Sequence, residues 1–138
     1  MTQLKSVARN AVTSSVPIGP TERASLLASI ERDIEKYLEY ADCVYLKAEA
    51  GSTVGYVLVK EYWNLAHLFV FPEHQGRGIG KSLLLSALNA CKANNQEGFV
   101  RVNSSLNAAG FYEKSGFVAY EPENPVPDFA VPMIYRFQ

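Results

Sequence analysis

A chain of 138 residues has the length of one domain and can bury roughly two-thirds of its unfolded surface in a core. The 13 basic and 14 acidic residues leave a net charge of −1, which argues against nucleic-acid binding, because such domains usually carry a basic surface. No apolar run has the length of a membrane span or a signal-peptide core, and the isolated Cys43 and Cys91 fit neither a disulfide framework nor a metal site. We therefore expect one cytoplasmic domain over residues 1–138, with reduced cysteines and no membrane, nucleic-acid or metal partner.

The N-terminal residues 1–20 hold few large apolar side chains and several proline and glycine residues, so we expect an irregular arm there. Within this arm, a short first strand is considered at Leu4–Val7. An amphipathic helix is predicted over residues 21–40, with Thr21 as its cap. Its apolar residues recur at helical spacing: Leu26, Leu27, Ile30, Ile34, Tyr37 and Leu38. Its opposite, charged face is expected to be solvated.

Apolar runs rich in β-branched and aromatic residues predict the strands. Cys43–Ala48 and Thr53–Tyr62 form a hairpin around Glu49–Ser52, and Asn64–Phe71 is a third strand. The later elements are a helix from Ile79 that ends at Asn94, a strand at Phe99–Asn103, a short helix at Asn107–Ser115 with Gly116 as its stop, a strand at Phe117–Glu121 and a last strand at Val131–Phe137. This order predicts an α/β fold.

Three glycines alternate at Gly76, Gly78 and Gly80, between a predicted strand and a predicted helix. Glycine lets the backbone adopt unusual dihedral angles and approach a ligand without a Cβ atom in the way. The first amides of a helix have no intrahelical acceptor and lie at the positive end of its dipole, so they can hold phosphate oxygens, with Arg77 and Lys81 adding charge. The pattern predicts a site for a phosphorylated ligand. The alternative is a tight strand-to-helix connection without a ligand.

Two common phosphate-binding motifs do not fit this bend. A P-loop requires a glycine at the position of Gln75, five residues before Gly80 and the Lys81 that follows it. A dinucleotide fingerprint requires a glycine three residues after Gly78, and that residue is Lys81. We therefore do not expect ATP or NAD as the ligand.

The segment Gln75–Gly80 has the pattern Gln/Arg-x-x-Gly-x-Gly/Ala and follows the apolar run Leu68–Glu73. It resembles the pyrophosphate-binding motif of the GNAT superfamily of acyl-CoA-dependent N-acetyltransferases. Asn107–Phe117 resembles the second motif of that superfamily, a helix that carries a tyrosine and ends in Gly-Phe. The resemblance covers residues 64–118. It implies a GNAT-type α/β fold, a mixed and mostly antiparallel sheet with splayed central strands flanked by helices.

The implied activity is transfer of an acetyl group from acetyl-CoA to a primary amine in a ternary complex, with no metal. Tyr112 matches the residue that protonates the departing thiolate, and the amide of Val70 would polarise the thioester carbonyl. The implied cofactor-binding residues are Phe69, Val70 and Phe71 for the pantetheine arm, Gln75, Gly76, Arg77, Gly78, Ile79, Gly80 and Lys81 for the pyrophosphate, and Asn107, with Asn103 as a weaker candidate, for the arm.

Several of these residues have a second interpretation. His67 lies where relatives carry an acidic residue and shares a strand face with Phe69, so it is either a general base or water-positioning residue, or a buried structural histidine. Glu61 is the other candidate base, or a surface carboxylate. Tyr112 could instead be a core aromatic residue. Four aromatic residues either line an acceptor pocket or pack in the core, namely Tyr56, Tyr62, Trp63 and Phe71.

Two other functions are consistent with this sequence. One is a non-catalytic acyl-CoA-binding module, and the other is a β-α-β interaction domain whose glycines only shape the chain. The presence of Tyr112 favours the enzyme. The acceptor, a small molecule or a peptide or protein amine, is not defined by the sequence, because acceptor loops are the variable part of such folds. A homodimer is compatible with the sequence.

Overall fold

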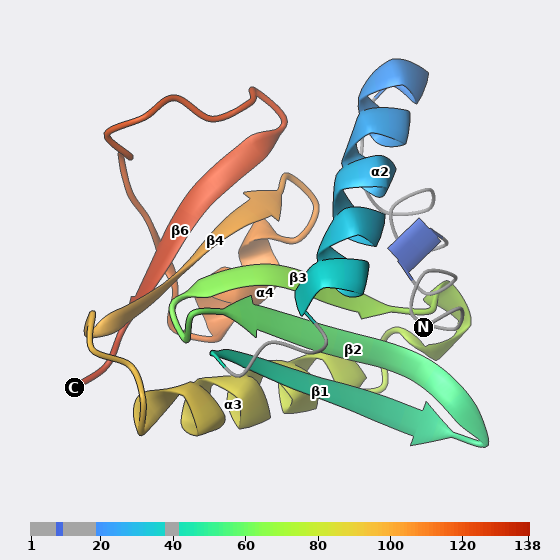
Figure 1. Ribbon diagram of the computed structural model, residues 1–138, viewed down its shortest axis with the longest axis horizontal. Helices are drawn as coiled ribbons and strands as arrows, with labels where there is room; N and C mark the ends of the chain where they lie inside the picture. The colour runs from blue at the N-terminus through green and yellow to red at the C-terminus, as the bar shows by residue number, and fades with distance from the viewer. Residues whose placement is uncertain (1–7, 10–18, 38–41) are drawn as a thin grey trace.

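The computed structural model describes residues 8–9, 19–37 and 42–138, and the strand considered at Leu4–Val7 lies outside them. Within the described residues, six strands form one sheet in the order β1-β2-β3-β4-β6-β5 (Figure 1). All neighbouring strands are antiparallel except β3 and β4, which are parallel, so the expected mixed, mostly antiparallel sheet is confirmed. The strands are β1 (Cys43–Ala50), β2 (Ser52–Lys60), β3 (Asn64–Val70), β4 (Phe99–Ser105), β5 (Val118–Ala119) and β6 (Ala130–Arg136).

Helices cover both faces of this sheet (Figure 1). They are α2 (Pro20–Tyr37), the short 3₁₀ helix η1 (Pro72–His74), α3 (Ile79–Lys92) and α4 (Ala109–Lys114). On one face, Ile30 and Ile34 of α2 pack against Tyr56 of β2. On the other face α3 presents its predicted apolar stripe, which includes Leu84 and the free thiol of Cys91, both fully buried. No helix within the described parts of the chain is long and apolar enough to cross a membrane.

The predicted start of α2 is wrong by one residue. The helix begins at Pro20, and the amide of Arg23 donates a hydrogen bond of 2.9 Å to the carbonyl oxygen of Gly19. Proline suits the first position of a helix, because its φ angle is already helical and its missing N–H would have no partner there. Thr21 therefore lies inside the first turn. Residues 38–40, the predicted end of this helix, lie outside the described residues.

A β-bulge in β3 decides which of its side chains reaches which face. Leu58 of β2 pairs with His67 and Val59 pairs with Leu65, so Ala66 is an extra residue in β3. In a regular strand without the bulge, Leu65 and His67 would share a face, because they are two residues apart. Instead Leu65 packs into the core beneath α3, whereas His67 contacts Tyr56 on the face covered by α2.

The central strands β3 and β4 separate after two residue pairs. Asn64 pairs with Arg101 and Leu65 with Val102, and beyond them β4 continues beside β6 while β3 stays with β2. The other side of β3 is tightly packed, because a Cβ atom on Gly55 of β2 would lie only 2.9 Å from a backbone oxygen of β3. The predicted splay of the central strands is confirmed, and the open gap lies on the β4 side of β3.

Candidate active site

The glycine-rich bend gives α3 an N-terminus with free amide positions. Gly76 and Gly78 both have φ angles of 81°, a region that glycine enters without steric cost. The first intrahelical hydrogen bond runs from the amide of Ser82 to the carbonyl oxygen of Gly78, at 3.0 Å. The amides of residues 79–81 therefore have no acceptor within the helix and lie at the positive end of its dipole. This end of α3 can hold an anion.

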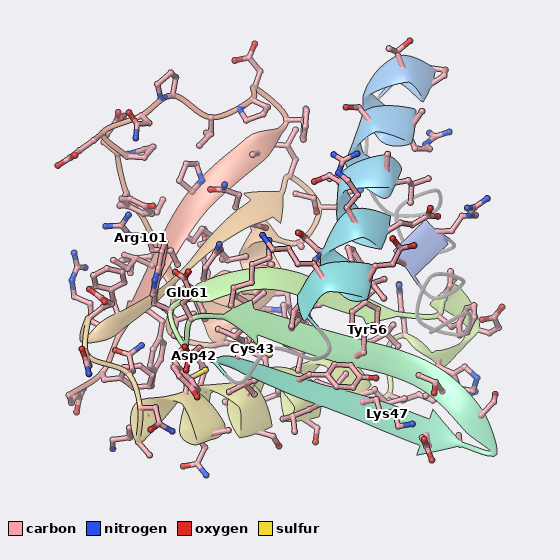
Figure 2. The ribbon with its side chains drawn as sticks, viewed as in Figure 1. Asp42, Cys43, Lys47, Tyr56, Glu61 and Arg101 are labelled. Carbon is pink, nitrogen blue, oxygen red and sulfur yellow. The ribbon has the colours of Figure 1, made fainter. Side chains whose placement is uncertain are left out.

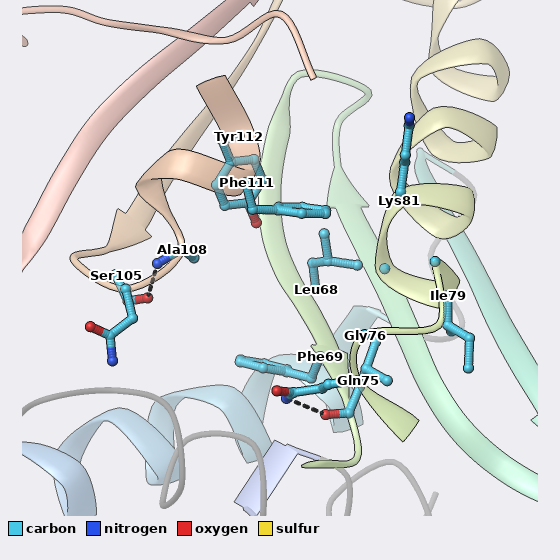
Figure 3. Close-up of a pocket in the computed structure, with 14 residues that line it drawn as sticks. Leu68, Phe69, Gln75, Gly76, Ile79, Lys81, Ser105, Ala108, Phe111 and Tyr112 are labelled. Carbon is cyan, nitrogen blue, oxygen red and sulfur yellow. Dashed lines mark hydrogen bonds between the residues drawn. The ribbon is translucent and has the colours of Figure 1, made fainter. Parts of the chain in front are cut away.

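A cavity of about 680 Å³, which we call the bend cavity, extends from these amides along the open edge of β3 to α4 (Figure 3). Phe111 and Tyr112 lie on one side of it, Gln75, Gly76 and Ile79 on the other, and Leu68 between them (Figure 3). Its lining includes these expected site residues: Phe69, Val70, Gln75, Gly76, Gly78, Ile79, Gly80, Lys81, Asn107 and Tyr112. It also includes four residues that the sequence did not predict: Leu68, Ser105, Ala108 and Phe111.

Two of the expected cofactor-binding residues lie outside the bend cavity. Arg77 is exposed and lines a neighbouring hollow of about 520 Å³, together with Lys47 and Glu49 of β1. Phe71 donates its amide to the carbonyl oxygen of Val54 at 2.8 Å, and its side chain packs in the apolar cluster under α2. Neither side chain lines the bend cavity. Arg77 nevertheless lies between Gly76 and Gly78, which do line it, so its positive charge is near the cavity.

The pairing of β3 with β2 shows which backbone groups face the gap. In an antiparallel pair, successive residues direct their amides and carbonyls alternately toward the partner and away from it. Because Phe71 bonds to β2, Phe69 also turns toward β2, whereas Leu68 and Val70 turn toward the gap. The side-chain amide of Gln75 donates to the carbonyl oxygen of Val70 at 3.0 Å. Strand alternation alone would have predicted Leu68, two residues before Val70.

Tyr112 is held in α4 by its neighbours and is only 6% exposed. Its ring makes edge-to-face contacts with Phe111 and Phe117, with centroid distances of 5.2 and 5.3 Å. Burial raises the pKa of the Tyr112 hydroxyl above its ordinary value of 10.0. The phenol is therefore protonated at neutral pH and can act as a hydrogen-bond donor. Gly116, with a φ of 102°, follows α4 as the predicted stop.

A second cavity, of about 330 Å³, lies between α2, the splayed strands and the loop before β6; we call it the α2 cavity. Asp33 of α2, His67 of β3 and Asn103 of β4 line it. It shares wall residues with the bend cavity, namely Leu68, Phe69, Ser105, Ala108 and Tyr112. The two cavities therefore adjoin at the splay, and Tyr112 lines both of them.

His67 is the centre of a buried polar network on the wall of the α2 cavity. Its side chain is 1% exposed; Nδ1 lies 3.1 Å from the Tyr56 hydroxyl and Nε2 lies 3.2 Å from Oδ2 of Asp33. The other oxygen of Asp33 lies 2.8 Å from Nζ of Lys60. A carboxylate only accepts, so Nε2 carries the proton and Nδ1 accepts from Tyr56. Both ring nitrogens are thus engaged, which favours the structural interpretation of His67 over direct proton abstraction.

Burial and hydrogen bonding set the charges in this network. Burial lowers the pKa of His67, although its hydrogen bond to Asp33 acts in the opposite direction, so the imidazole is neutral. Burial also tends to raise the pKa of Asp33, but the hydrogen bonds from His67 and Lys60 outweigh it and keep the carboxyl below its ordinary pKa of 3.8. Asp33 is therefore an anion at neutral pH. No motif marks Asp33 in the sequence, although its position three residues after Ile30 places it on the buried stripe of α2.

Glu61, the other candidate base, lies away from both cavities. Glu61 and Tyr62 have positive φ angles of 54° and 65°, so they form a turn rather than the predicted end of β2. Figure 2 shows Glu61 close to Asp42, at the end of the sheet opposite to Lys47. Its side chain is exposed, which agrees with the surface interpretation. Tyr62 and Trp63 line neither cavity.

The lowered pKa of His67 should make stability depend on pH. When the protein unfolds, His67 regains its ordinary pKa of 6.5, so the unfolded state binds more protons as the pH falls below that value. We expect the free energy of unfolding to decrease between about pH 7 and pH 5, and His67→Gln to flatten this dependence. Urea unfolding at a series of pH values measures both. An equal slope in the two proteins would show that His67 does not cause it. The stability that Asp33 contributes is lost only as the pH falls below its ordinary pKa of 3.8, which is outside this range.

Comparison with known proteins agrees with this geometry. Residues 21–133 match the family described as "Acetyltransferase (GNAT) domain". The chain belongs to this family, and it is an acyltransferase. No curated protein matches the sequence significantly.

Solved structures of GNAT proteins share the fold. A GCN5-related N-acetyltransferase from Rhodopseudomonas palustris has a TM-score of 0.76 at 20% identity, over 99% of this chain and 89% of that one. The PaiA N-acetyltransferase from Thermoplasma acidophilum, solved in complex with coenzyme A, has a TM-score of 0.73 at 22% identity, over 96% and 90%. A putative acetyltransferase of the GNAT family from Desulfovibrio desulfuricans has a TM-score of 0.67 at 19% identity, over 100% and 94%. At these identities the likeness concerns the fold.

Proposed function

We propose that this acyltransferase moves an acetyl group from acetyl-CoA to a primary amine while both are bound. The observation that carries this proposal is the meeting of the two cavities at Tyr112, with the anion-holding end of α3 at the far side of one of them. Acetyl-CoA occupies the bend cavity, and the amine enters from the α2 cavity. The PaiA N-acetyltransferase that shares the fold was solved with coenzyme A, which supports this choice of ligand.

The residues around the bend cavity fit a pyrophosphate and a pantetheine arm. The amides of residues 79–81 and the side chain of Lys81 provide donors and positive charge for the pyrophosphate. Gly80 suits this position, because a Cβ atom there would lie 3.7 Å from the ring of Phe111 and would narrow the cavity. Leu68 and Val70 offer backbone groups to the arm, and Asn107 offers its side-chain amide.

The reaction requires few protein groups once the two substrates are aligned. The amine nitrogen attacks the thioester carbonyl, a C–N bond forms, and the C–S bond breaks. The Val70 amide donates to the oxyanion that develops on the carbonyl oxygen. The Tyr112 hydroxyl gives its proton to the leaving sulfur. The amine releases one proton to solvent, and solvent returns one proton to Tyr112.

A non-catalytic acyl-CoA-binding module remains the second candidate. The observation that favours it is the lining of the bend cavity, in which the described residues include no carboxylate and no imidazole that could accept a proton. Such a module would bind acetyl-CoA and release no CoA with any amine. The enzyme and the module would therefore both bind acetyl-CoA, and only the enzyme would release CoA when an amine is present.

Binding of acetyl-CoA should stabilise the protein against unfolding. At a free concentration of about 100 times Kd, we expect about 2.7 kcal/mol of added stability, measured by urea unfolding, with NADH as a control that gives none. Turnover is then followed by chromatography of free CoA, because Cys43 is partly exposed and would react with a thiol reagent. A folded protein that acetyl-CoA does not stabilise would contradict the proposal. Binding without CoA release in any amine mixture would select the module.

A further inference from the structure

The α2 cavity has walls of a narrow chemical type. Most of the lining is apolar and comes from four parts of the fold, with Leu26 and Ile30 on α2, Phe69 on β3, Val102 on β4, and Pro127 and Phe129 in the loop before β6. Its volume of about 330 Å³ is at the small end of the range for ligand sites. A compact apolar body is therefore the natural occupant of this space.

The charge on these walls has one sign. Among the described lining residues Asp33 is the one side chain with a formal charge, and no lysine or arginine lines the cavity. Lys60 pairs with Asp33 from outside the lining. A ligand carboxylate in this cavity would meet an anion and no cation, whereas an ammonium group would meet a carboxylate.

Three of the other polar side chains of the cavity already have hydrogen-bond partners in the protein. The Ser104 hydroxyl donates to the backbone oxygen of Ser105 at 2.7 Å, and the Ser105 hydroxyl accepts from the amide of Ala108 at 3.2 Å. Both nitrogens of His67 are hydrogen-bonded as well. A carboxylate has about four acceptor positions, and the contacts of Asp33 with His67 and Lys60 occupy two of them. The remaining positions of Asp33 can accept from a ligand.

We propose that the acceptor is a primary monoamine with a compact apolar body, an arylalkylamine or a short alkylamine, whose ammonium group binds at Asp33. This inference rests on the proposed acetyl transfer. Asp33 is then a specificity residue: it attracts the cation, and the apolar walls receive the body. The captured ammonium releases one proton to solvent, and the neutral nitrogen then attacks the thioester carbonyl. His67 and Lys60 position its carboxylate from behind. A second charge on the acceptor, of either sign, would be buried without a second charged side chain in the lining to pair with it and would reduce binding.

Matched pairs of amines test this specificity. L-Phenylalanine differs from 2-phenylethylamine by a carboxylate, and L-phenylalaninamide replaces that carboxylate with a neutral group of similar size. Cadaverine differs from pentylamine by a second ammonium group. We expect kcat/KM for each monoamine to exceed that for its doubly charged counterpart by about tenfold or more, with phenylalaninamide closer to 2-phenylethylamine than to phenylalanine. Equal use of phenylalanine and 2-phenylethylamine, or of cadaverine and pentylamine, would overturn the inference.

Two variants test the role of Asp33 itself. Asp33→Asn keeps the shape and should raise KM for 2-phenylethylamine about tenfold, with KM for acetyl-CoA unchanged. Asn103→Lys adds a cation to the cavity wall and should improve phenylalanine relative to 2-phenylethylamine, a gain that remains measurable if Asp33→Asn does not fold. An unchanged KM in a folded Asp33→Asn protein would overturn the inference. So would a protein that binds acetyl-CoA and acetylates no monoamine, whereas absence of acetyl-CoA binding would reject the proposed function instead.

Discussion

Replacing Tyr112 with phenylalanine should lower kcat by about a hundredfold or more, because a positioned proton donor typically contributes about 10²–10⁴ to a rate. The substitution keeps the ring contacts with Phe111 and Phe117, so the fold and the affinity for acetyl-CoA should not change. Steady-state kinetics with a saturating amine gives kcat, and calorimetry gives the Kd of acetyl-CoA.

The matched control for this variant is Tyr120→Phe, which removes the same atom from a tyrosine that packs beside Arg101 and lines neither cavity. Its kcat should equal that of the unchanged protein. If Tyr112→Phe also retains full kcat, the phenol does not protonate the leaving sulfur, and water would have to do so. A loss of acetyl-CoA affinity in Tyr112→Phe would assign the hydroxyl to binding rather than to proton transfer.

Placing a negative charge at Gly80 should weaken acetyl-CoA binding by at least about a hundredfold. Gly80 lies in the first turn of α3 on the wall of the bend cavity. Two unit charges 4 Å apart repel by about 4 kcal/mol at an effective dielectric constant of about 20, and about 2.7 kcal/mol of that corresponds to a hundredfold in Kd. The fold should tolerate Gly80→Asp, because a Cβ atom there makes ordinary contacts and an acidic residue is favourable in the first turn of a helix.

Gly80→Asn separates charge from size in this experiment, since asparagine and aspartate have nearly the same shape. We expect the asparagine variant to bind acetyl-CoA more tightly than the aspartate variant by about tenfold or more, with both as stable to urea as the unchanged protein. Calorimetry measures the two Kd values. Equal affinities would mean that the end of α3 does not hold the pyrophosphate.

Local sequence signals predicted the strands, the bend and α4, because each of them depends on residues that are neighbours in the chain. The glycines at 76 and 78 need positive φ angles whatever lies around them, and Gly116 ends α4 for the same reason. The apolar stripe of α3 has one helical period and packs on the sheet as predicted. The splay of β3 and β4 followed from family resemblance rather than from any pattern in the residues.

The features that the sequence analysis missed depend on contacts between distant segments. Asp33 joins the site only because α2 crosses the sheet beside β3, and its partners His67 and Lys60 lie 34 and 27 positions later in the chain. The exclusion of Phe71 from the bend cavity depends on its hydrogen bond to Val54 of β2. Neither pairing has a signature in local periodicity. Asp33 did leave a weak signal, an acidic residue at a buried helical position.

The side chain of Gln75 also determines the polarity of the open strand edge. Because Gln75 donates to the carbonyl oxygen of Val70, the last residue of β3 presents to the gap an amide donor and a carbonyl oxygen whose acceptor capacity is already partly used. A carbonyl oxygen therefore docks there more favourably than an N–H group does. In the proposed reaction, this polarity favours one alignment of the pantetheine arm along β3, with the thioester oxygen at Val70 and the amide hydrogens further back along the strand. A single glutamine can thus set how far the acetyl group advances toward the amine.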